Sequence, residues 1–165
     1  MNDISRFAKN GYNDKPERDA FKKMIRSDPF LRNFIKEYCK LDINYAPYRE
    51  IDDPLGPYAV DMGIVDKNEN MVCLIEVDVF FAWKDEWPSY YKWCHRLARK
   101  EKYWKDTTYP YINITFNTNH KNGIMTTREI ESRYPVIDKW FKQKQMTERL
   151  REVPISSAIK IGEWA

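Results

Sequence analysis

The chain has 165 residues, of which 42% are hydrophobic and 15% aromatic, and its formal net charge is +3 at pH 7. A chain this rich in bulky apolar side chains is not intrinsically disordered, and its length fits one domain spanning residues 1–165. The longest uncharged apolar stretch, 71–75, is far shorter than the roughly 20 residues that cross a bilayer, and no signal-peptide core follows the first residues. Three widely spaced cysteines without a C-x-x-C pair exclude a disulfide framework. We therefore expect a cytoplasmic protein in a reducing compartment.

The first half of the chain predicts two helices and a β-hairpin. A helix is expected to open at 15–17, and apolar residues at helical spacing predict a second over 30–38. A turn at 52–57 is followed by two runs rich in strand formers, 58–65 and 71–80. A polar turn joins the two runs, so we expect them to pair as an antiparallel hairpin.

The second half predicts further helices and strands. We expect a long helix from 88 to about 105, a strand over 111–116 and a returning strand over 123–127. A helix interrupted at Pro135 is expected over 128–144, and a last strand over 153–161. This order predicts a mixed α/β domain.

The predicted hairpin gathers acidic side chains on one face. With a turn at 67–70, one side of the sheet carries six apolar residues: Val60, Met62, Ile64, Cys73, Ile75 and Val77. The other side then carries Asp61 opposite Glu76, and a shift of one residue would bury acids. Carboxylates roughly 4–5 Å apart repel by about 3–4 kcal/mol at an effective dielectric near 20. A shared proton or a divalent cation would relieve this repulsion; the alternative is a solvated face whose acids pair with nearby Lys or Arg.

The spacing of these acids resembles a nuclease family. Asp61, fourteen intervening residues and then Glu76-Val77-Asp78, on successive strands followed by a helix, is similar to the PD-(D/E)XK superfamily over roughly residues 58–116. The resemblance implies a restriction-endonuclease-like mixed-sheet core of order α-β-β-β-α-β, flanked by helices. It also implies a Mg²⁺ ion, replaceable by Mn²⁺, bound by Asp61, Glu76 and the Val77 carbonyl.

The helix before the hairpin supplies a further acid in some family members, which would be Glu17 or Glu37 in this chain. Two positions depart from the family pattern: Val60 replaces a proline, and Asp78 replaces the usual lysine. Lys92 or Arg96, on the predicted long helix, would then replace that lysine. Without such a cation, Asp78 would be a metal ligand or a base that orients the attacking water. The catalytic candidates are therefore Asp61, Glu76, Asp78 and Lys92.

Cations and aromatic residues accompany the acids. Four basic side chains fall within about two turns of the predicted long helix and would lie along a phosphate backbone, or else form a solvated face: Lys92, Arg96, Arg99 and Lys100. An aromatic group near them favours a core or an interface over stacking on unpaired bases: Trp83, Trp87, Tyr90, Tyr91, Trp93, Tyr103 and Trp104.

These features predict a Mg²⁺-dependent DNA endonuclease that hydrolyses backbone phosphodiester bonds through an activated water. It is most similar to small free-standing homing and phage-encoded nucleases, the latter acting in a bacterial host. The expected partner is double-stranded DNA, with a homodimer engaging both strands, and not a membrane. The first alternative is a nuclease-like fold that binds nucleic acid or a partner without cleaving. A weaker alternative is a regulatory protein whose acidic face and aromatic group bind another protein.

Overall fold

Two amphipathic helices open the part of the chain that the computed structural model describes, which is residues 14–41, 48–52, 54, 60–105 and 107–164. They are α1 (Lys15–Ser27) and α2 (Pro29–Cys39), and each has a proline in its first turn, where the missing N–H is not needed. The Asp28 carboxylate caps α2 by accepting a hydrogen bond of 3.0 Å from the Phe30 N–H. Both predicted N-terminal helices are confirmed.

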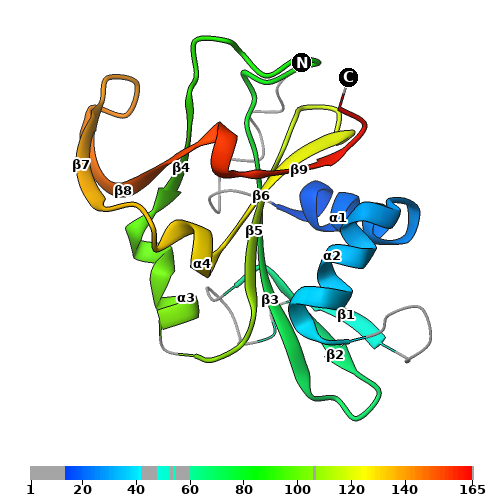
Figure 1. Ribbon diagram of the computed structural model, residues 1–165. Helices are drawn as coiled ribbons and strands as arrows, with labels where there is room; N and C mark the ends of the chain where they lie inside the picture. Colours follow the sequence, from blue (N-terminus) through cyan, green and yellow to red (C-terminus); the bar gives the residue numbers. More distant parts are fainter. Residues whose placement is uncertain (1–13, 42–47, 53, 55–59, 106, 165) are drawn as a thin grey trace.

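A six-stranded sheet packs against these helices (Figure 1). Its strands follow the order β1-β2-β3-β5-β6-β9. All neighbours are antiparallel except β3 and β5, which are parallel. The strands are β1 (Tyr48–Asp52), β2 (Met62–Asp66), β3 (Met71–Val79), β5 (Tyr111–Phe116), β6 (Asn122–Thr127) and β9 (Ile159–Gly162). The predicted mixed α/β class is confirmed, as are the predicted strands over 111–116 and 123–127.

The β2–β3 hairpin keeps most of its predicted register. Met62 pairs with Ile75 and Ile64 with Cys73, as expected, but a bulge after Ile64 pairs Val65 with Met71. The apolar face packs on α1 and α2, while Val60 belongs to a separate cluster with Leu74 and Trp104 on the other side. Residues 58–59, most of the predicted turn at 52–57 and the side chain of Tyr103 lie outside the described part.

A three-stranded sheet covers the opposite face of the large sheet (Figure 1). Its order is β4-β8-β7, formed by β4 (Trp93–Leu97), β7 (Val136–Phe141) and β8 (Met146–Pro154). Its Cys94 and Val153 pack against Ile124 of β6. The molecule is therefore layered as helices, a large sheet and a small sheet.

Both long helices predicted for the second half are wrong. Residues 93–97 instead pair with β8 as a strand, so only η2 (Ala98–Glu101) and α3 (Lys102–Lys105) are helical in that segment. After α4 (Arg128–Glu131), Pro135 is followed by β7. The last predicted strand is divided between β8 and β9 by η3 (Ile155–Ser157). None of the helices among the described residues is long and apolar enough to span a bilayer.

Candidate functional site

The candidate site lies where β2 begins, beside the second half of β3. Even-numbered residues of β3 bond to β5, as shown by Leu74 N–H to Pro110 O (2.8 Å) and Phe80 N–H to Phe116 O (2.9 Å). In a strand the N–H and C=O of one residue point to the same side, and those of the next residue point to the opposite side. Because the even-numbered residues bond to β5, the N–H and C=O of Val77 point toward β2. There the Asp61 carboxylate, one residue before β2, accepts the Val77 N–H at 2.9 Å. Asp61 therefore lies on the side to which the Val77 carbonyl points.

Glu76 completes a reciprocal contact with Asp61. Its Oε1 accepts the Asp61 N–H at 3.0 Å, and its Oε2 lies 3.1 Å from Lys100 Nζ. The Glu76 side chain is buried, with the residue only 2% exposed. The predicted proximity of the two acids is therefore present, and η2 brings Lys100 to them.

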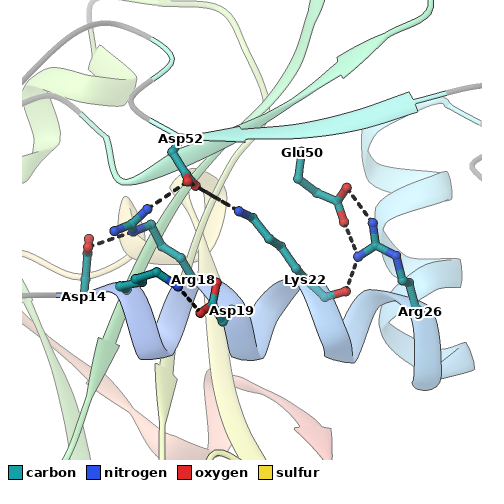
Figure 2. Close-up of polar contacts among 8 residues, drawn as sticks. Asp14, Arg18, Asp19, Lys22, Arg26, Glu50 and Asp52 are labelled. Carbon is teal, nitrogen blue, oxygen red and sulfur yellow. Dashed lines mark hydrogen bonds and ion pairs between the residues drawn. The ribbon is translucent and has the colours of Figure 1, made fainter.

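A third carboxylate, Asp14, reaches Asp61 from the start of α1 through a side-chain hydrogen bond. Arg18 positions it: its guanidinium contacts Asp14 Oδ1 at 2.8 Å and Asp52 Oδ2 at 2.9 Å (Figure 2). Figure 2 also shows Lys22 on Asp52 and Arg26 on Glu50, so ion pairs dock α1 along β1.

The helix acids expected from the sequence lie elsewhere. Glu17 is fully buried and bonded to His120 Nε2 at 2.5 Å, and Glu37 is exposed on α2. The one sequence signal for Asp14 is its place just before a helix start containing Pro16, which is typical of an N-cap residue.

The environment shifts the pKa values of this cluster. Burial, the hydrogen bond with Asp14 and the Glu76 charge raise the pKa of Asp61 to about 9, despite the Val77 N–H. Burial also raises the pKa of Glu76, although Lys100 opposes the shift. Burial alone would lower the pKa of Lys100, but Glu76, Asp78 and Asp61 together raise it. These acids therefore retain a proton to higher pH than exposed carboxyls do, while Lys100 favours its charged form.

Asp78 lies next along the same face of β3, and its Oδ1 is buried without a hydrogen-bond partner among the described residues. It contributes to the electrostatic field at Lys100. A buried carboxylate oxygen without a donor is costly, so Asp78 has spare capacity to accept a hydrogen bond or coordinate a cation.

The remaining predicted cations do not share a helical face. Lys92 is exposed just before β4, and Arg99 is an exposed residue of η2 with its side chain 3.6 Å from Glu148. Arg96 is 3% exposed, and its guanidinium bonds to Thr126 and Thr115. The predicted basic helix is therefore wrong, because β4 turns Arg96 into the protein interior. Of these four cations, Lys100 is the one that contacts Glu76.

The aromatic group divides in two. Trp83 is fully buried and packs with Trp87 and Trp164, in agreement with the favoured core interpretation. Tyr90 and Trp93 are instead 74% and 43% exposed.

The donor set fits the magnesium ion that the resemblance implies. Asp61, Glu76 and the Val77 carbonyl are hard oxygen donors, and Mg²⁺ typically takes one or two carboxylates and keeps several waters. The unpartnered Asp78 oxygen is adjacent. No group of three or more His, Cys, Asp or Glu side chains is arranged as a metal cage within the described ranges. Binding of the ion would displace a proton from these carboxyls and the Lys100 ammonium from Glu76.

No protein-family model matches the chain, and neither a curated protein nor a solved structure matches it. The local arrangement of the acids and Lys100 is thus the main support for any functional assignment. That arrangement can hold a proton between carboxylates, or a divalent cation in its place.

Proposed function

We propose that the protein is a magnesium-dependent DNA endonuclease that hydrolyses backbone phosphodiester bonds. The observation that carries the proposal is the meeting of Asp61, Glu76 and Lys100 where β2 separates from β3. Buried acids with raised pKa values beside a charged lysine are typical of functional sites.

The order of elements also supports a restriction-endonuclease-like core. Helices precede three antiparallel strands, and β5 returns parallel to β3 after a crossover. The proposed order α-β-β-β-α-β requires one helix in this crossover, which here contains β4, η2 and the short α3.

Each side chain of the site has a separate role in the proposed reaction. Asp61, Glu76 and the Val77 carbonyl would hold the magnesium ion, which when bound acidifies water and offsets charge on the phosphate. Asp78 would orient the attacking water and accept its proton through its free oxygen. Lys100 would stabilise the negative charge that develops on the phosphate oxygens. Lys100 thus replaces Lys92 as the proposed equivalent of the family lysine.

DNA cleavage with defined metals tests this proposal. Plasmid, linear and branched DNA are incubated with Mg²⁺, Mn²⁺ or a chelator. We expect cutting with either metal, and loss of cutting in the chelator and in the Asp61→Asn and Glu76→Gln variants. The matched control is Asp138→Asn, an exposed acid on β7 whose side chain is 69% exposed. Cutting that survives the chelator would contradict the mechanism.

A second candidate is a non-catalytic module that binds DNA. It is favoured by the Lys100–Glu76 contact, because a lysine already neutralises the carboxylate that would bind the metal. This candidate predicts salt-dependent DNA binding without cleavage in any metal, and no heat of Mg²⁺ binding in calorimetry. The proposed homodimer for cutting two strands is tested by sedimentation with and without duplex.

A further inference from the structure

A cavity of about 720 Å³ opens beside the carboxylates, between the end of β3 and the three-stranded sheet. Its volume falls within the roughly 300–1,000 Å³ of small-molecule sites. Asp78 and Lys100 line it. Both also belong, with Asp61 and Glu76, to the candidate site described above, which we call the acidic site. Any group bound in this cavity would therefore lie next to a phosphate held by the acidic site.

Aromatic rings line the cavity on two sides. On the β3 side, the Phe80 ring lies 5.4 Å from Trp87 and 4.9 Å from Tyr91, centroid to centroid. On the side of the small sheet, Phe141 lies 5.6 Å from the His95 ring. Trp93 of β4 also lines the cavity and keeps 43% of its surface exposed. Flat rings that reach solvent are suitable surfaces for stacking a base.

The polar groups of the cavity match a nucleotide. Lys144 Nζ lies 5.2 Å from the Phe141 ring centroid, and Lys100 adds a second cation, so the rings are accompanied by charges that attract phosphate. A purely apolar ligand would leave these two cations unused.

Building on the proposed function, we propose that this cavity holds one unstacked base of the nucleotide beside the scissile phosphate. The preferred substrate is then single-stranded DNA or a duplex with an unpaired nucleotide. A base within an intact duplex is covered on both faces, and extruding it requires breaking its stacking and pairing. Fully paired duplex would therefore bind more weakly at this site.

Binding measured in chelator tests the cavity without cleavage. A fluorescein-labelled 12-nucleotide single strand and its duplex are titrated by anisotropy with wild type, Trp93→Ala and Phe141→Ala. Loss of one stacking partner should weaken single-strand binding by about 5- to 100-fold. The matched control is Trp140→Ala, which removes a 58% exposed tryptophan next to Phe141 that does not line the cavity. It should change binding less than about twofold, and thermal melting checks the fold of each variant.

The outcomes separate the cavity from the nuclease proposal. If wild type cleaves DNA in a metal- and Asp61-dependent way but neither cavity variant weakens single-strand binding, the cavity proposal is wrong and the nuclease proposal stands. If both variants weaken single-strand binding but no metal supports cleavage, the cavity proposal stands and the enzyme assignment fails. Equal losses for single strand and duplex, or a loss in Trp140→Ala as large as in Trp93→Ala, would also overturn the cavity proposal.

Discussion

Two buried charged clusters lie beside each other on the large sheet, and they differ in how fully their groups are paired. In the first, which we call the arginine cluster, Arg96 donates to Thr115 Oγ1 at 2.7 Å, Thr126 Oγ1 at 2.8 Å and the Asn113 carbonyl at 3.3 Å. Thr126 in turn donates to Glu131 at 3.1 Å. The cluster joins β4 to β5 and β6 with its guanidinium bonded on three sides.

The acidic site is paired much less completely. Asp61, Glu76 and Asp14 lie close together, Lys100 is the cation that contacts Glu76, and one Asp78 oxygen has no donor among the described residues. Buried polar groups are normally satisfied, so a cluster that gives up stability in this way calls for a functional explanation. The comparison assigns the arginine cluster to folding and the acidic site to chemistry.

Removing Arg96 should produce the largest loss of stability. In Arg96→Met the buried Thr115 and Thr126 hydroxyls and the Asn113 carbonyl lose their donor, and each buried polar group left unsatisfied costs about 1–3 kcal/mol. Urea unfolding measures the change. Adding Glu131→Gln should restore part of the loss. If Arg96→Met lowers the free energy of unfolding by less than about 1 kcal/mol, the arginine cluster does not hold the two sheets together.

Asp61→Asn should reduce DNA cleavage strongly and leave stability unchanged or higher, the opposite of Arg96→Met. We expect at least about a 1,000-fold loss of cleavage rate, or about 4 kcal/mol, since metal-assisted charge stabilisation is worth several kcal/mol. The unfolding free energy should stay equal or rise, because the variant lacks a buried carboxyl whose raised pKa costs stability at neutral pH. Substantial unfolding of this variant would show that Asp61 is structural, and the contrast between the clusters would then fail.

The titration of Glu131 sharpens the contrast further. Burial raises the pKa of Glu131 to about 7, although Arg96 opposes the shift. The folded state therefore holds more protons than the unfolded state between pH 4.5 and 7, and stability from this group falls as pH rises through that window. Wild type should lose up to about 3 kcal/mol more than Glu131→Gln between pH 4.5 and 8. Parallel curves of unfolding free energy against pH would contradict this.

Lys100→Met and Lys92→Ala test which lysine serves the site. We expect about a 100-fold loss of cleavage in Lys100→Met, the size found when one group that stabilises transition-state charge is removed. Lys92→Ala should change cleavage less than about threefold, since Lys92 is exposed before β4. Single-turnover rates with saturating DNA make the comparison, and the reverse order would return Lys92 to the catalytic role.

The hairpin register was predictable because the alternation of apolar residues around the turn allows only one good pairing. That pairing places Asp61 beside Glu76 and aligns Met62 with Ile75, as observed. The local pattern did not reveal the bulge after Ile64 or the departure of Val60 from the expected face. The bulge and the position of Val60 both depend on the path of the chain at the two ends of β2.

Contacts between segments far apart in the sequence decided the features that the sequence did not predict. The apolar residues of 93–97 have helical spacing, but pairing with β8, far along the chain, makes the segment a strand. The same pairing buries Arg96 and directs η2, with Lys100, toward Glu76. Asp14 meets Asp61 only because α1 docks on β1. Local periodicity contains no information about these arrangements.

The docking of α1 on β1 has a second consequence, for solubility. Among the strands that the structure describes, β1 lies at an edge of the large sheet, and unpaired backbone groups along an edge invite association with other chains. It is short, and its charged residues Arg49, Glu50 and Asp52 each form an ion pair within the molecule. Asp52 also belongs to the ion-pair network that holds Asp14 near Asp61. The same network thus also discourages aggregation through the edge of β1.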